Sequence, residues 1–186
     1  MHMPTLPTRA LGKTGLDVCV LGIGCAWLGR QPDNSINFET GVAAVIAALE
    51  AGIRLIDTAS LYSFGEAERM VGEALRQRPD LARDTLVETK IRDVRDFTYT
   101  ADEARRSVET SLQRLGIDRI PMIYIHDPPA DIVGRVVGPD GALAGLRRRE
   151  PYRPVDTTLA AAVLRLQIHS HSTSKEIRAA PKRAAA

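Results

Sequence analysis

The chain of 186 residues is 44% hydrophobic and 26% charged, an ordinary globular composition that is sufficient for one domain with a core. Its longest apolar stretches, 18–23 and 42–49, are too short to span a bilayer, and residues 1–4 lack the apolar core of a signal peptide. We therefore expect a cytoplasmic protein with no membrane partner. Cys19 and Cys25 are the only cysteines, and we expect both to be reduced, with no disulfide and no metal.

The net charge of +2 is unevenly distributed along the chain. From Arg147 to the end, nine Lys or Arg stand against three acidic residues, whereas the preceding 146 residues carry 16 basic and 20 acidic ones. A nucleic-acid site would rest on this tail alone, and the tail has no aromatic residue beyond Tyr152 with which to stack bases. We therefore predict no nucleic-acid partner and a solvated, partly helical tail with a disordered end.

The first predicted elements are a hairpin and a buried strand. Residues 9–17 place two glycines between short apolar pieces, which is typical of a β-hairpin, and Gly12-Lys13-Thr14 lacks the longer turn of a phosphate loop. Residues 18–24 form a continuous apolar run, which predicts a strand buried on both faces of a parallel sheet. Its glycine-rich end permits close approach of a ligand, but Gly22-Ile23-Gly24 is only half of a Rossmann fingerprint.

Strand and helix patterns then alternate up to Glu150. The best helix begins at Thr100, which forms a capping box with Glu103, and ends at Gly116. Alternation of this kind implies parallel strands joined by right-handed crossovers. The helices are expected over 38–51, 65–78, 100–115 and 141–149, and the strands over 54–58, 85–91 and 120–125.

The fold class predicted from this order is α/β, a partial (β/α)8 TIM barrel with a hairpin followed by about four strand–helix units. A complete barrel takes about 250 residues, and no further strand pattern follows Glu150. Residues 1–150 are therefore the predicted barrel domain. Residues 151–186 are predicted to be a divergent basic tail, with one apolar helix over 158–166.

Four polar residues stand at or just beyond the ends of three successive predicted strands: Asp57 and Tyr62, then Lys90, then His126. In a parallel barrel this is the face on which active sites are built. Carbonyl reduction needs a proton donor for the oxygen, and a phenol with a pKa of about 10 is a reluctant one. A neighbouring ammonium lowers a phenol pKa, a carboxylate holds the ammonium, and an imidazole orients the substrate oxygen.

Each of these residues also has a structural interpretation when taken alone. Asp57 suits a cap at a strand end, Tyr62 a rim aromatic, Lys90 a solvated charge, and His126 a satisfied polar group before a turn. The combination of four complementary types at successive strand ends favours a catalytic site. For Trp27 two interpretations stay open, namely packing in the core or rim and a wall of the substrate site.

Several motifs of the chain resemble those of the aldo-keto reductase family between about Arg9 and Glu150. The resemblance implies a barrel that binds NADPH or NADH without a Rossmann fold. It also implies that Asp57, Tyr62, Lys90 and His126 form the catalytic tetrad, with Tyr62 as general acid or base. The motifs are Leu11-Gly12-Lys13-Thr14-Gly15, Leu55-Ile56-Asp57-Thr58-Ala59-Ser60-Leu61-Tyr62, Gly65-Glu66-Ala67-Glu68, Glu88-Thr89-Lys90 and Tyr124-Ile125-His126-Asp127-Pro128.

The resemblance extends to the cofactor and the substrate. It places Gly24 and Asp57 at the cofactor, and Trp27 and His126 at the substrate, which would be a small carbonyl compound or a sugar. The segments Gly22-Ile23-Gly24-Cys25-Ala26 and His126-Asp127-Pro128 are most similar to the branch that oxidises aldoses, such as fucose or threo-aldoses, at carbon 1.

Two hypotheses follow, because relatives of this family continue through four more strand–helix units that are not recognisable here. The first is an NAD(P)-dependent oxidoreductase acting on an aldehyde, ketone or aldose, with a homo-oligomer covering the open barrel edges. The second is a truncated, non-catalytic homologue that acts as a binding or interaction module. A half barrel leaves two unpaired sheet edges, which favours association in either case.

Overall fold

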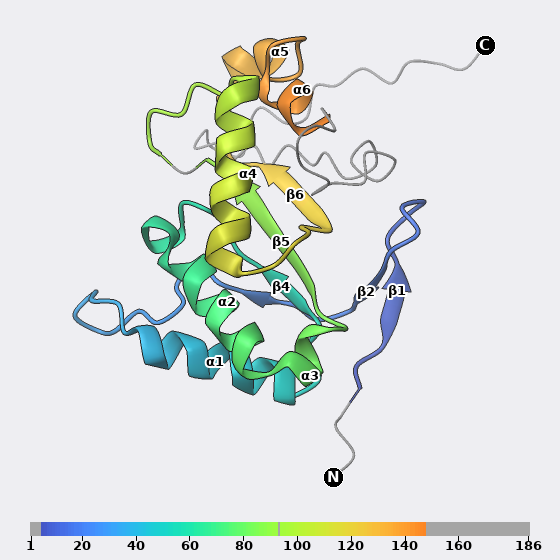
Figure 1. Cartoon of the computed structure of the whole chain (residues 1–186), viewed down its shortest axis with the longest axis vertical. Coiled ribbons are helices and arrows are strands. Elements are labelled where there is room, and N and C mark those ends of the chain that lie inside the picture. Colours follow the sequence, from blue (N-terminus) through green and yellow to red (C-terminus); the bar gives the residue numbers. More distant parts are fainter. Residues whose placement is uncertain (1–4, 93, 148–186) are drawn as a thin grey trace, which may run out of the picture.

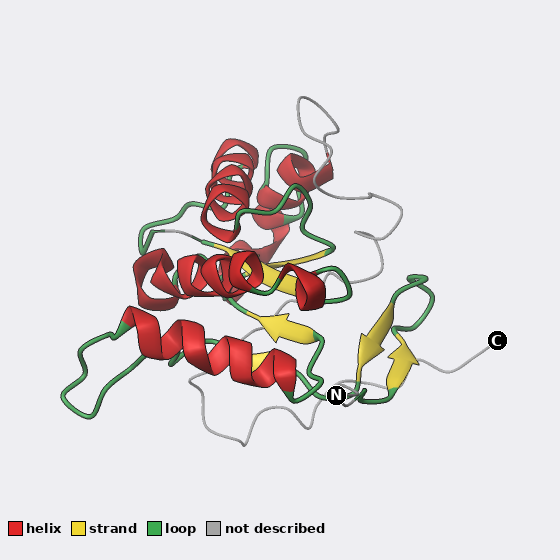
Figure 2. Ribbon diagram, turned by 60° about the horizontal axis from the view of Figure 1, so that its bottom comes forward, coloured by secondary structure: helices red, strands yellow, loops and turns green. Residues whose placement is uncertain are grey.

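A computed structural model of the protein describes residues 5–92 and 94–147. Its centre is a four-stranded parallel sheet in the order β3-β4-β5-β6, and α1, α2 and α4 lie side by side along one face of this sheet (Figures 1 and 2). The strands are β3 (Ile23–Gly24), β4 (Leu55–Asp57), β5 (Leu86–Ile91) and β6 (Met122–Ile125). The helices are α1 (Phe38–Glu50), α2 (Glu66–Gln77), α3 (Pro79–Ala82), α4 (Ala101–Leu115), α5 (Val133–Val136) and α6 (Ala142–Arg147).

The predicted α/β fold, a partial barrel of strand–helix units after a hairpin, is confirmed. Each strand pairs in parallel with its neighbour along the chain, as right-handed crossover connections require. The register aligns Gly24 with Asp57 and Asp57 with Glu88, while Lys90 lies opposite Tyr124. The carboxyl ends of all four strands therefore meet along one edge of the sheet.

The prediction of one buried strand over 18–24 is wrong. Residues up to Cys19 belong to the antiparallel hairpin of β1 (Thr8–Ala10) and β2 (Asp17–Cys19), which lies apart from the sheet in Figure 1. Val20 and Leu21 are half exposed in the connection, and only β3 joins the parallel sheet, as its edge. An apolar run shows which residues are hydrophobic but not where the chain turns between two sheets.

The helix boundaries follow from the caps that the sequence supplies. Asn37 accepts a hydrogen bond from the backbone of Thr40 at the start of α1, and the capping box of Thr100 and Glu103 is present at the start of α4. Gly116 ends α4 in the left-handed conformation, with φ of 64°. Four short elements were not predicted: α3, α5 and the 3₁₀ turns η1 (Tyr62–Gly65) and η2 (Ala130–Ile132).

The core lies between the helices and the sheet. Val45 and Leu49 of α1, Met70 and Val71 of α2 and Ile56 of β4 are fully buried there. The helices approach one another closely where glycines permit it, and one such approach is at Gly72 of α2. A Cβ atom there would lie 2.6 Å from the carbonyl oxygen of Arg114 and 2.7 Å from that of Leu115, at the end of α4.

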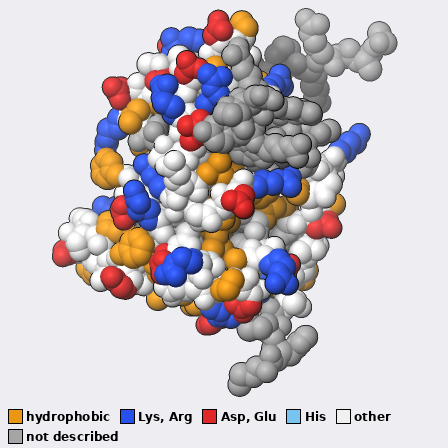
Figure 3. All heavy atoms as spheres, in the orientation of Figure 1, with side chains coloured by type: hydrophobic (Ala, Val, Ile, Leu, Met, Phe, Trp, Pro, Cys, Tyr) orange, Lys and Arg blue, Asp and Glu red, His pale blue; other side chains and the backbone are white. Residues whose placement is uncertain are grey.

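Basic, acidic and hydrophobic side chains are interspersed over the face shown in Figure 3. None of the helices in the described part of the chain is long and apolar enough to cross a membrane. The predicted basic tail, its helix over 158–166 and the domain boundary near residue 150 lie outside the described residues, and these expectations stay predictions.

Replacing Gly72 with alanine is expected to destabilise the protein by about 1–3 kcal/mol, although alanine is the better helix former, because the new methyl group meets two backbone carbonyls that cannot move independently. Denaturant unfolding followed by circular dichroism measures the change. Gly134→Ala in α5 is the matched control, since nothing lies within 4 Å of its added Cβ, and it should be neutral or stabilising. Equal effects of the two substitutions would contradict the close contact of α2 with α4.

Candidate active site

The structure brings the four polar residues predicted from the strand ends together at the carboxyl edge of the sheet. Asp57 is the last residue of β4, Lys90 is the second-last residue of β5, and His126 directly follows β6. Tyr62 opens η1 (Tyr62–Gly65), the 3₁₀ turn that leads from β4 into α2. Each side chain is therefore positioned by a different segment of the same edge.

Lys90 is the centre of this cluster. Its side chain is only 3% exposed, and the ammonium group contacts the carboxylate of Asp57. It also donates to the carbonyl oxygen of Thr58 at 2.9 Å and to the hydroxyl oxygen of Tyr62 at 3.2 Å. Burial disfavours the charged amine, but the hydrogen bond and charge of Asp57, with Tyr62, outweigh burial and raise the pKa of Lys90.

His126, which follows β6, completes the cluster. Its imidazole stands edge-on to the ring of Tyr62, with the ring centroids 5.6 Å apart. Burial lowers the pKa of His126, and the positive charges of Lys90 and Arg92 lower it further. The carboxylate of Asp127, which lies 3.7 Å from Nε2, opposes this shift. The ring is therefore neutral near neutral pH. Its buried Nδ1 has no hydrogen-bond partner among the described residues.

The backbone that carries His126 is held by a residue that the sequence analysis missed. The hydroxyl of Tyr99 donates to the carbonyl oxygens of His126, at 2.9 Å, and of Asp127, at 3.0 Å. Asp127 has a φ of 41°, a conformation that non-glycine residues rarely adopt without support. No spacing rule in the sequence links residue 99 to the end of β6.

Gly24 and Trp27 lie at the rim of the same edge. Gly24 pairs with Asp57 in the sheet register, and open space surrounds the position where a Cβ would stand. Trp27 is 68% exposed, with the guanidinium of Arg30 stacked 4.2 Å from its ring centroid. This exposure rules out core packing for Trp27, and its role as a wall of the substrate site stays a prediction.

Glu88 is a second residue that the sequence analysis missed. It faces the same side of β5 as Lys90, two residues away, and it is the register neighbour of Asp57. Burial and the charge of Asp57 raise the pKa of Glu88 to about 7, against the opposing influence of Lys90 and of a hydrogen bond from Tyr124. Period-two alternation along β5 would have placed it beside the predicted lysine.

Cys25, also next to this cluster, is fully buried and free. Burial and the negative charge of Asp57 raise the pKa of its thiol to about 12, which keeps it protonated and unreactive. Among the residues that the structure describes, no group of three or more His, Cys, Asp and Glu side chains has an arrangement that could hold a metal ion.

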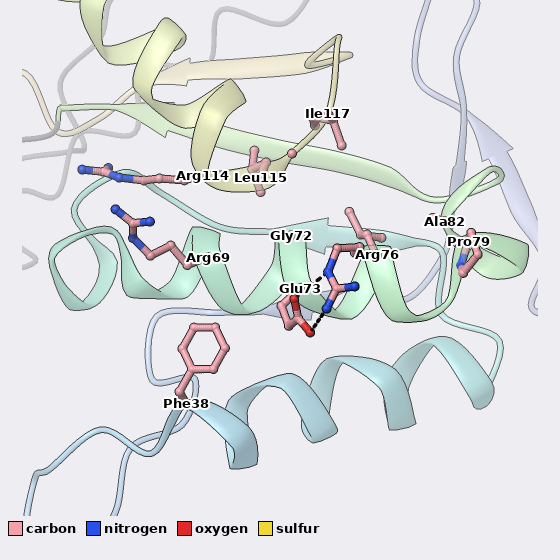
Figure 4. A pocket seen from close by; sticks show the side chains of 12 residues that line it. Phe38, Arg69, Gly72, Glu73, Arg76, Pro79, Ala82, Arg114, Leu115 and Ile117 are labelled. Carbon is pink, nitrogen blue, oxygen red and sulfur yellow. Dashed lines mark hydrogen bonds and ion pairs between the residues drawn. The ribbon is translucent and has the colours of Figure 1, made fainter.

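A separate groove of about 520 Å³ lies among the helices, between α1, α2 and the end of α4 (Figure 4). Phe38 and three arginines line it, and one of these, Arg76, is joined to Glu73. None of the four strand-end residues contributes to this groove. The four candidate catalytic side chains therefore lie at the strand ends and not in the groove.

The chain forms a segment of a parallel β/α barrel, and its polar cluster lies at the carboxyl ends of the strands. This is the face on which barrel enzymes carry their active sites. Comparison with known proteins specifies the class further. The sequence pattern of the Aldo/keto reductase family matches residues 20–162, and the chain belongs to this family.

Two of the curated relatives of the chain are dehydrogenases by name. Pyridoxal 4-dehydrogenase of Microbacterium luteolum is 31% identical over 75% of this chain and 47% of its own length. L-galactose dehydrogenase of Arabidopsis thaliana is 32% identical over 67% of this chain and 39% of its own. The crystal structure of a Bombyx mori aldo-keto reductase in complex with NADP superposes with a TM-score of 0.56 at 26% identity, over 67% of this chain and 39% of that one. The chain thus spans less than half the length of these relatives.

Replacing Glu88 with glutamine is expected to remove a pH dependence of stability. The carboxyl has a pKa of about 7 in the folded protein and 4.5 as its ordinary value, so rising pH ionises it first in the unfolded chain. The free energy of unfolding of the wild type should therefore fall relative to Glu88→Gln as pH rises through this interval. The difference should reach about 1–2 kcal/mol and then stay constant, after allowance for screening.

Urea unfolding at about pH 5 and about pH 8 measures this difference. Glu39→Gln, which removes an exposed carboxylate on α1, is the control and should leave the pH profile of the wild type unchanged. Parallel profiles of the wild type and Glu88→Gln would contradict a buried, protonated Glu88.

Proposed function

We propose that the chain is an NAD(P)-dependent oxidoreductase that transfers a hydride reversibly between nicotinamide and the carbonyl group of an aldehyde, ketone or aldose. One observation carries the proposal. The buried ammonium of Lys90 contacts the Asp57 carboxylate on one side and the Tyr62 hydroxyl oxygen on the other. Such a bridge is the arrangement that assists proton transfer by a phenol.

In this proposal each residue has one task. Tyr62 gives its hydroxyl proton to the carbonyl oxygen of the substrate during reduction and takes it back during oxidation. The ammonium of Lys90 stabilises the negative charge left on the phenolic oxygen, and Asp57 keeps the ammonium charged and in place. The neutral imidazole of His126 donates a hydrogen bond that orients the substrate oxygen beside Tyr62.

The residues of this edge fit the reactive end of a nicotinamide. Gly24 leaves open space next to Asp57, and Asp57 is only partly buried at the same edge of the sheet. Gly24 and Asp57 would line the cofactor, which supplies the hydride when bound. The solved relative in complex with NADP supports the choice of nucleotide.

The substrate proposed is a small aldehyde or an aldose that is oxidised at carbon 1. The two relatives carry the names of a pyridoxal and a galactose dehydrogenase, and both compounds present a carbonyl carbon or its cyclic hemiacetal among several hydroxyl groups. The exposed ring of Trp27, at the rim of the strand ends, would form one wall of the pocket for such a molecule.

We also propose that a second copy of the chain covers the sheet edges at β3 and β6. Each of these strands pairs on one side only within the described residues, and unpaired strand edges favour association. The alternative of a non-catalytic interaction module shares this feature and differs in having no turnover. Light scattering during size exclusion gives the association state, and a monomeric active protein would exclude the dimer.

Replacing Tyr62 with phenylalanine is expected to lower kcat for carbonyl reduction by about 10²–10⁴-fold, because general acid catalysis contributes on that order and the phenyl ring has no proton to give. The substitution keeps the ring contact with His126, so the fold should be unchanged. The assay is NADPH oxidation with a panel of aldehydes and aldoses. Turnover that survives the substitution would exclude Tyr62 as the proton donor.

Replacing Lys90 with methionine should lower turnover by a comparable factor, because a neutral side chain of similar length cannot stabilise the phenolic oxygen. Lys13→Met, at an exposed position in the turn of the hairpin, is the matched control and should retain wild-type turnover. Equal losses of turnover in the two variants would contradict a specific role of the Lys90 ammonium in the reaction.

A further inference from the structure

The phenol of Tyr62 and the ammonium of Lys90 belong to two separate segments that must be aligned. Tyr62 stands on the turn between β4 and α2, where Ser63, Phe64 and Gly65 have φ values of 49°, 57° and 91°. A run of left-handed residues that includes a serine and a phenylalanine is unfavourable by itself. The surrounding structure must therefore hold this turn in place.

Ser60 joins the two segments on the inner side. Its hydroxyl donates to the carbonyl oxygen of Lys90 at 2.8 Å and accepts from the backbone N–H of Arg92 at 3.1 Å. Its own backbone N–H donates to the same Lys90 carbonyl at 3.1 Å. These bonds fix where the turn leaves β4 but do not reach the left-handed residues that follow Tyr62.

An ion pair reaches the turn from the outer, helix-covered side. Glu68 of α2 is fully buried, and its carboxylate accepts from the hydroxyl of Thr89 at 2.7 Å and pairs with Arg114 of α4 at 3.2 Å. Thr89 is the residue before Lys90 in β5. One carboxylate thus connects the strand of Lys90 to the helix that follows it.

Arg114 extends this connection to the turn of Tyr62. Its Nη1 lies 3.4 Å from the carbonyl oxygen of Ser60. The guanidinium also lies flat against Gly65, since a Cβ there would be 2.5 Å from Cζ of Arg114. Both ends of the turn, Ser60 and Gly65, are therefore in contact with one guanidinium.

We propose that Glu68 and Arg114 are positioning residues, which hold the hydroxyl of Tyr62 within reach of the Lys90 ammonium. Neither touches the reacting atoms, and their importance for turnover rests on the function proposed above. A buried ion pair contributes little net stability compared with apolar residues of the same size, so its geometric role carries the inference. The planar guanidinium contacts Glu68, Ser60 and Gly65 at once, which a lysine ammonium cannot do.

The test variant is Arg114→Lys, which keeps the charge opposite Glu68 but loses the flat contact with the turn. Arg106→Lys, at an exposed position of the same helix, is the matched control. Because loss of Arg114 geometry leaves a buried carboxylate poorly paired, a second variant, Glu68→Gln with Arg114→Gln, removes both charges at similar volume. All variants are prepared as the full chain.

The primary readout needs neither cofactor nor turnover. Isotopically labelled tyrosine gives one ring resonance per tyrosine in an NMR spectrum; Tyr62→Phe assigns the resonance of Tyr62, and Lys90→Met shows where it moves when the ammonium is absent. In Arg114→Lys we expect the Tyr62 resonance to move toward its position in Lys90→Met, with the resonance of Tyr99 unchanged. Arg106→Lys should reproduce the wild-type spectrum.

Turnover gives the second readout. Displacement of a reacting group by about 1 Å costs on the order of 10²-fold, so kcat of Arg114→Lys should fall by about 10–100-fold while KM stays within about twofold. A wild-type Tyr62 resonance in either folded variant would overturn the proposal. So would loss of the fold in both, which would assign the pair a general structural role. A wild type without turnover whose Tyr62 resonance still responds would contradict the proposed function and leave the positioning role supported.

Discussion

The buried ammonium of Lys90 is the constraint on which the site depends. Removing an ammonium from water costs several kcal/mol, so the fold must supply compensating partners. It does so with the carboxylate of Asp57 at the end of β4 and with the carbonyl of Thr58 and the hydroxyl of Tyr62 in the segment that follows. The parallel register of β4 and β5 brings these partners beside the lysine, so the chemistry follows from strand pairing and not from a flexible loop.

Much of this arrangement could be predicted from sequence, because strand ends in a parallel sheet meet at one edge and four polar residues mark those ends. The capping box of α4 is likewise a local signal, fixed by Thr100 and Glu103 alone. What escaped prediction depends on distant contacts. The support of His126 by Tyr99 joins residues 27 apart in sequence, and the division of residues 18–24 between a hairpin and a sheet depends on which strands lie alongside.

Glu88 and the pair of Glu68 and Arg114 show a further limit of sequence reasoning. Alternation along β5 places Glu88 on the face of Lys90, yet its raised pKa follows from the neighbouring strand that carries Asp57. Glu68 had been noticed only as part of a family motif, and a carboxylate on a helix is usually solvated. Its complete burial depends on the packing of α4 against α2, which places Arg114 beside the Glu68 carboxylate.

The described residues carry the whole polar cluster, whereas the chain spans less than half the length of its relatives. Cofactor binding therefore tests the oxidoreductase assignment most directly. The measurement is a titration of the purified full chain with NADPH and with NADH, following cofactor fluorescence and recording molar mass in the same samples. We expect saturable binding of at least one nucleotide. A folded, homogeneous sample that binds neither would contradict the assignment and leave the strand-end cluster without a hydride donor.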